Sequence, residues 1–162
     1  MSKLTDDEFY DALSSEDQLG MVIRGHIHLE HWLDNFLLTA MPLYENYEKG
    51  INADYKTKVL MCCALGLAPE LQGPLSAVGT LRNKFAHLPS YKLTESDVNN
   101  LYASLSSAHK QHLKQAFLIL ARRFQRESSS FVKIDYIERL NLIFMLLHSK
   151  LKKANAQLIQ TS

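Results

Sequence analysis

The sequence of 162 residues contains few turn-forming residues and few cysteines. Six glycines and four prolines are too few for the frequent turns of an all-β sandwich or barrel. The only two cysteines, Cys62 and Cys63, are adjacent within the apolar run VLMCCALGL. Because adjacent cysteines match neither a metal-ligand spacing nor a disulfide framework, we expect two free, buried thiols with a structural role in a reducing compartment.

The sequence also lacks a long apolar segment. No run reaches the roughly 18 residues of a membrane-spanning helix. The first residues, MSKLTDDEFYDAL, are acidic and have no apolar core of the kind found in secretory signals. We therefore expect a cytoplasmic protein without a membrane partner. Residues 1–162 should form one domain, long enough to bury a hydrophobic core.

Positive charge is scarce in the first half of the chain, and negative charge is scarce in the second. The formal net charge is +1, but residues 1–81 carry 5 Lys or Arg against 12 Asp or Glu, and residues 82–162 carry 13 against 5. This asymmetry fits a polyanionic partner on the basic side, association between unlike halves of two copies, or ordinary solvated helix surfaces.

No segment has the alternation of apolar and polar residues that is typical of a strand. Helical spacing predicts a short helix to about residue 13 and a long helix capped by Ser14 and Ser15 that ends near residue 40. Further helices are expected over about residues 53–65, 74–88, 94–125 (with a break near SLSS) and 133–158. Pro42 and the polar stretch YENYEKGINAD should be non-helical. The expected buried stripes are Leu19, Val22, Leu29, Leu33, Phe36 and Ala40; Leu101, Leu105, Leu113, Phe117, Leu120 and Phe124; and Ile137, Leu140, Phe144, Leu147 and Leu151. The sequence thus predicts an all-α, single-domain helical bundle of five to seven helices.

The stretch LRNKFAH, residues 81–87, places Arg82, Asn83 and His87 in the fourth predicted helix. At 100° per residue, Asn83 and His87 share a face with Ser76 and Gly79, where another backbone could approach closely. Arg82 lies about 140° from His87 around the same helix. One straight helix therefore does not bring both side chains to one small substrate, whereas a second copy of the helix in a homodimer could supply the missing partner.

LRNKFAH resembles the signature of the HEPN superfamily, small all-α proteins whose motif is Arg, four to six residues, then His. The segment KVLMCCALGLAPELQGPLSAVGTLRNKFAH is similar to the mannitol operon repressor branch of that superfamily. VIRGHIHLEHWLDNFL resembles the long second helix of the same proteins, and LTESDV resembles their downstream cap. The resemblance covers about residues 15–105 and implies a HEPN-like fold.

In catalytic members of the superfamily, the implied activity is metal-independent cleavage of RNA, with no cofactor. Carried over to this chain, His87 would act as general acid or base at the ribose 2′-OH. Arg82 would stabilise the phosphate, and Asn83 would position the pair. A toxin-like or defence-like nuclease of this kind would have a cognate antitoxin as partner.

Two other interpretations of the motif stay open. The repressor branch implies a non-catalytic transcriptional regulator or interaction module that acts through a regulatory protein partner. Alternatively, the motif is structural: Asn83 and His87 bond to each other, and Arg82 binds a carboxylate. The nuclease requires both Arg82 and His87 to be open to a shared cleft, whereas the regulator tolerates their burial.

The stretch RGHIHLEH, residues 24–31, carries a second group of polar residues. One polar stripe consists of Arg24, His28, His31 and Asn35. His26, which lies inside the apolar stripe, forms a second pair with Glu30, four residues later. There are two interpretations of these side chains. Either they make interhelical hydrogen bonds or lie exposed at the surface, or Arg24, His26 and Glu30 contact and orient the residues of the motif helix. Because His-Glu-x-x-His and other strong ligand motifs are absent, no metal site is expected.

Basic residues gather on the last two long predicted helices. They are Arg122, Arg123, Arg126, Lys150, Lys152 and Lys153. Cations at this spacing can follow the phosphates of a nucleic acid without reading bases, or they can form a solvated face. Neither a helix-turn-helix nor a zinc finger is recognisable.

Overall fold

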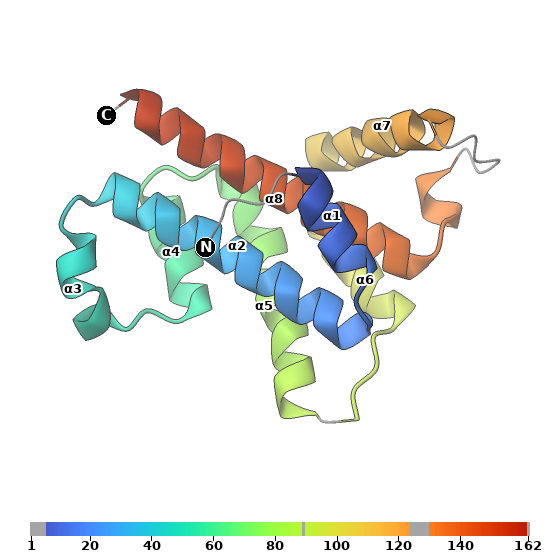
Figure 1. Cartoon of the computed structure of the whole chain (residues 1–162), viewed down its shortest axis with the longest axis horizontal. Helices are drawn as coiled ribbons and strands as arrows, with labels where there is room; N and C mark the ends of the chain where they lie inside the picture. The colour runs from blue at the N-terminus through green and yellow to red at the C-terminus, as the bar shows by residue number, and fades with distance from the viewer. Residues whose placement is uncertain (1–5, 89, 124–129, 162) are drawn as a thin grey trace.

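The computed structural model describes residues 6–88, 90–123 and 130–161, and within these ranges it is helical, without a strand (Figure 1). The elements form a single helical domain. They are α1 (Asp6–Ser14), α2 (Gln18–Ala40), α3 (Tyr44–Ile51), α4 (Tyr55–Ala64), α5 (Gln72–His87), α6 (Glu95–Ala103), α7 (Ser107–Arg123) and α8 (Tyr136–Thr161), with short 3-10 helices η1 (Pro69–Leu71) and η2 (Phe131–Lys133). The all-α prediction is confirmed. Among the described residues, no helix combines the length and the apolar character needed to cross a membrane.

The long helices α2 and α8 make the most extensive contact in the fold and lie side by side in Figure 1. Buried apolar side chains from both helices meet there, and Gly25 allows a close approach. A Cβ atom added at Gly25 would lie 2.5 Å from Cε1 of Phe144. At the other end of the contact, the Asn155 side chain donates hydrogen bonds to the carbonyls of Trp32 (3.1 Å) and Leu151 (2.9 Å). The two helices are therefore held by close apolar packing and by a satisfied buried amide donor.

Two expectations about the first half of the chain were wrong. The cap of α2 is Asp17, whose carboxylate accepts from the Gly20 N–H at 2.7 Å, whereas the Ser15 hydroxyl turns back to the Ala12 carbonyl. In addition, α3 forms within the stretch that was expected to be non-helical. The bundle therefore has eight α-helices in the described ranges, one more than the upper limit of the prediction.

The physical basis of α3 is local. Glu45 lies in its first turn and Lys49 in its last, where their charges favour the helix dipole. Asn52 ends the helix in the left-handed conformation (φ 46°). Tyr44, 3% exposed, is buried and anchors the helix to the core.

Other helix ends follow the expected signals. At the end of α4, Gly66 adopts φ 106°, its N–H bonds to the Cys63 carbonyl, and the Leu67 N–H bonds to the Cys62 carbonyl. This is the Schellman arrangement, which favours glycine. At α6, Thr94 and Asp97 form a reciprocal capping box, and residues 104–106 separate α6 from α7 as expected.

Most of the expected core residues are buried, with some exceptions. Leu19 is 48% exposed, whereas Ala40 and Ile137 are half-buried. The side chain of Leu120 and the whole of Phe124 lie outside the described residues. Cys62 is fully buried, and burial raises the pKa of its thiol to about 12. Cys63 is only half-buried, so the expectation of two buried cysteines holds for Cys62 alone.

The contact between α2 and α8 predicts opposite effects for two glycine-to-alanine substitutions. Gly25→Ala should lower the free energy of unfolding by about 1–3 kcal/mol, because the new methyl group forces the Phe144 ring out of its place. Gly50→Ala is the matched control, since nothing lies within 4 Å of a Cβ there. It should raise the free energy of unfolding by roughly 0.4–1 kcal/mol. Urea titration measures both, and equal stabilities of wild type and Gly25→Ala would contradict the packing argument.

Candidate functional site

The motif residues lie at the C-terminal end of α5, which runs across α2 in Figure 1. Buried Leu75, Val78 and Leu81 hold one side of the helix against the core. α5 contacts α2, α4 and α6. The helix ends at His87, and Leu88 caps it in an extended conformation, as expected for a residue before proline.

The side chains of the three motif residues are exposed to solvent to different degrees. Arg82 is half-buried, whereas Asn83 and His87 are exposed. The Arg82 guanidinium donates a hydrogen bond of 3.3 Å to the Asn83 side-chain oxygen. Within the described ranges, Arg82 has no carboxylate at ion-pair distance, and Asn83 and His87 are not hydrogen-bonded to each other. The contacts required by the structural interpretation are thus not formed among these residues, and the guanidinium is oriented by an amide.

The small-residue face of α5 is partly occupied within the chain. A Cβ atom at Gly79 would lie 2.9 Å from the ring of Tyr55 on α4, so the close approach that Gly79 permits is made by this aromatic ring. The exposed part of the face is its C-terminal portion, with Asn83, Ala86 and His87. A partner that meets this face of α5 would therefore contact the end of the helix rather than the part around Gly79.

His26, on α2, interacts electrostatically with Arg82. It is 6% exposed, and its ring centroid is 4.2 Å from that of Tyr55. Burial lowers the pKa of His26; the Glu30 carboxylate, 3.8 Å away, opposes this shift. The positive charges of Arg82 and Lys58 lower the pKa further. The imidazole is therefore neutral at pH 7 and adds no positive charge beside Arg82.

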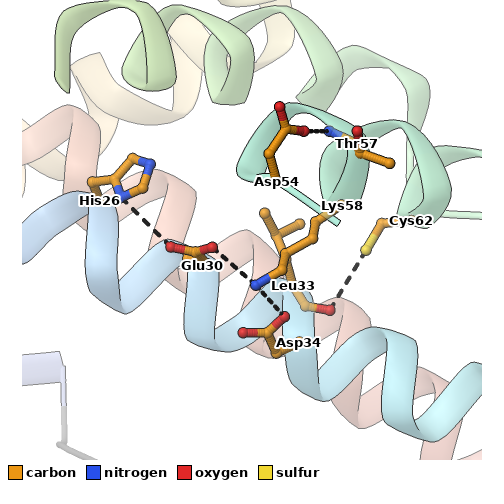
Figure 2. Close-up of polar contacts among 8 residues, drawn as sticks. All are labelled: His26, Glu30, Leu33, Asp34, Asp54, Thr57, Lys58 and Cys62. Atoms are coloured by element: carbon orange, nitrogen blue, oxygen red, sulfur yellow. Dashed lines mark hydrogen bonds and ion pairs between the residues drawn. The ribbon is translucent and has the colours of Figure 1, made fainter. Parts of the chain in front are cut away.

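Lys58 on α4 binds two carboxylates of α2, as Figure 2 shows. Its ammonium nitrogen lies 2.9 Å from Glu30 Oε1 and 2.9 Å from Asp34 Oδ1. The Lys58 side chain is only 13% exposed. Burial opposes its charge, but the two carboxylates outweigh this effect and raise its pKa. Lys58 is thus a fixed cation that ties α4 to α2.

The sequence did not predict a role for Lys58, Asp34 or Tyr55. One signal was present: Glu30 and Asp34 are four residues apart, so both carboxylates lie on one side of α2. Their shared cation comes from a different helix, 28 residues after Glu30 along the chain. Helical periodicity does not identify a partner at that separation.

The proposed supporting residues do not form one group. Arg24 pairs with Glu16 at the start of α2 (2.7 Å), with a side chain more than half exposed, whereas His26 and Glu30 face α4. His31 and Asn35 bond to each other at 3.1 Å. Of these residues, His26 is close enough to the motif to interact electrostatically with Arg82.

The predicted basic residues are described only in part. The side chains of Arg122 and Arg123 and the whole of Arg126 lie outside the described residues. On α8, Lys152 and Lys153 are exposed, and the Lys150 nitrogen is 3.2 Å from Nδ1 of His112. Lys150 and Lys153 line a hollow next to residues 66–71.

The end of α5 is tied to α6 through Asp97, which is 8% exposed. Its carboxylate accepts from Lys84 Nζ (2.7 Å), the Tyr91 hydroxyl (2.5 Å) and the Thr94 hydroxyl (2.6 Å). Burial by itself would raise the pKa of Asp97. The hydrogen bonds, led by that of Lys84, outweigh burial and hold the pKa well below its usual range. This cluster fixes the last turn of α5, where the motif lies.

Comparisons with known proteins do not assign this site to a family. No family model, curated protein or solved structure matches the chain. In the portion of the chain that the structure describes, no three His, Cys, Asp or Glu side chains gather in a way that could hold a metal ion.

The Asp97 cluster predicts a loss of stability in acid. A carboxylate whose pKa is lowered by folding stabilises the fold above its unfolded pKa of about 3.9, and this contribution is lost as the pH falls toward the folded pKa. Asp97→Asn should lower the free energy of unfolding at pH 7 by about 1–3 kcal/mol, since hydrogen bonds to a charged group are replaced. The difference from wild type should shrink between pH 5 and about pH 2. Urea titrations across this pH range measure it, and a difference that does not change with pH would contradict the role of the charge.

Proposed function

We propose that the protein is a metal-independent endoribonuclease of the HEPN type that acts on RNA as a homodimer. The proposal rests on the accessibility of Arg82 and His87 at the end of α5, since both side chains are at least partly exposed. In addition, Arg82 has no carboxylate partner among the described residues. A guanidinium without a carboxylate keeps its donors available for a phosphate. The hydrogen bond to Asn83 orients this group.

The proposed chemistry uses the RNA itself as nucleophile. His87 removes the proton of a ribose 2′-OH, and the 2′ oxygen forms a bond to the adjacent phosphorus. The bond from phosphorus to the 5′ oxygen breaks, and that oxygen takes a proton from the second histidine of the dimer. Arg82 stabilises the additional negative charge on the phosphate in the transition state. The products are a 2′,3′-cyclic phosphate and a 5′-hydroxyl.

A homodimer supports this chemistry for a geometric reason. Arg82 and His87 lie on different sides of α5, about 140° apart, so one protomer presents them in different directions. Since Tyr55 covers the helix at Gly79, the exposed C-terminal portion around Ala86 is the available surface for a second α5. Lys152, exposed on α8, is a candidate contact for RNA phosphates away from the reacting group.

The nuclease proposal predicts cleavage of single-stranded RNA in excess EDTA with a 2′,3′-cyclic phosphate product. His87→Ala should reduce the rate by about 10²–10⁴-fold, the usual effect of removing a general acid or base. Arg82→Ala should lose activity and also bind RNA more weakly. Because His87 is exposed, its substitution should leave the circular dichroism spectrum and thermal unfolding unchanged.

His31→Ala is the matched control for the loss of a histidine. His31 lies on α2, where it is hydrogen-bonded to Asn35, and it is not part of the motif on α5. This variant should retain wild-type cleavage. If wild type and His87→Ala leave a varied RNA pool equally uncut, the catalytic proposal is wrong. The remaining interpretation would then be a non-catalytic regulator that acts through a protein partner.

The dimer proposal predicts that Ala86→Glu separates the protomers. Ala86 is exposed in the single chain, so the substitution should not affect folding, but two carboxylates would be placed close together across the two-fold axis. Ala116→Glu, at an exposed position on α7, is the control and should remain dimeric. Light scattering measures the mass of each variant. A monomeric wild type at tens of micromolar would contradict the proposal.

A further inference from the structure

A hollow of about 390 Å³ lies where four parts of the chain meet. Its lining comes from the C-terminal half of α2, the connection between α4 and α5, the first turn of α7 and the C-terminal half of α8. Arg82, Asn83 and His87 do not line it. Its volume lies within the range of small-molecule sites, about 300–1,000 Å³.

One side of the hollow is apolar. Phe36 and Leu71, which are 2% and 3% exposed, belong to the core. Ala154 and Leu158 of α8 are half-buried beside them. Water against such a surface gains few hydrogen bonds, so the apolar part of a ligand would displace it favourably.

The other side carries positive charge. Lys150 and Lys153 are three residues apart on α8 and therefore project to the same side of the helix. Among the described residues, Glu70 is the one carboxylate in the lining, and neither lysine is at ion-pair distance from a carboxylate. The contact of Lys150 is instead with Nδ1 of His112, at 3.2 Å. Two ammonium groups are thus available to an anion.

His109 adds a buried polar group to the same lining. Its side chain is 5% exposed, and its Nδ1 has no hydrogen-bond partner among the described residues. Burial lowers the pKa of His109, and the charge of Lys150 lowers it further, whereas the Glu70 carboxylate opposes this shift. Because the net direction is downward, the imidazole is mostly neutral at pH 7. A buried polar atom without a protein partner requires an explanation, and a bound water or ligand group in the hollow would supply one.

We propose that this hollow binds a small amphipathic organic anion, a carboxylate or phosphate monoester attached to a short apolar body. The anionic group contacts Lys150 and Lys153, and the apolar body lies against Phe36, Leu71 and Leu158. This site is independent of the proposed nuclease centre.

Four probes test whether binding requires both the anionic group and the apolar body. They are octanoate, octyl phosphate, octanol and inorganic phosphate. Each is titrated into the ¹⁵N-labelled full-length protein, and amide chemical shifts are followed. At least one of the two amphipathic anions should saturate, with the largest shifts at residues 66–71, at the start of α7 and at residues 150–158. Octanol and inorganic phosphate should bind at least tenfold more weakly, since each lacks one of the two complementary parts.

Substitutions test the lysines directly. Lys150→Gln and Lys153→Gln should each weaken binding of the amphipathic anion by roughly three- to tenfold. Lys114→Gln removes the same charge from an exposed position on α7 that does not line the hollow, and it should bind as wild type does. The proposal is overturned if neither anion saturates, if octanol binds as well as octanoate, if the shifts lie elsewhere, or if Lys114→Gln weakens binding as much as the other two. RNA cleavage has no part in this assay, so its outcome is separate from that of the nuclease proposal.

Discussion

The close contact between α2 and α8 at Gly25 is the constraint on which the arrangement of the other helices depends. The Phe144 ring occupies the space that any larger residue at this position would need, so a glycine is required for the two longest helices to approach this closely here. The neighbouring residue, His26, points to a different side of α2, toward α4. Two sides of α2 therefore contact other helices, and its orientation against α8 determines where its polar side chains meet the rest of the chain.

The polar side of α2 then positions α4, and α4 in turn supports α5. Glu30 and Asp34 hold the Lys58 ammonium in a site with little exposure (Figure 2), where loss of the lysine would leave two neighbouring carboxylates without a cation. One helical turn before Lys58, the Tyr55 ring packs against His26 and fills the space at Gly79 of α5. The position of Arg82 follows from this series of contacts rather than from α5 alone.

Local signals were sufficient to predict several helix ends and the fold class. Gly66 ends α4 because a left-handed residue is required there, and Thr94 with Asp97 begins α6 through a reciprocal cap. Local signals failed where two candidates competed. Ser15 and Asp17 can both cap a helix, and the choice depends on where the preceding helix ends. The polar composition of residues 44–54 concealed α3, whose one buried anchor is Tyr44.

The sequence by itself determined the all-α fold, most of the buried stripes, and the presence of an arginine, an asparagine and a histidine near the end of one helix. Only the tertiary structure decided that Tyr55 covers Gly79, that Lys58 joins Glu30 to Asp34, and that Lys150 and Lys153 line a hollow with His109. The physical reason is that helical periodicity shows which face of a helix is buried but does not identify the helix opposite. These contacts join residues more than 20 positions apart, and they depend on how whole helices cross.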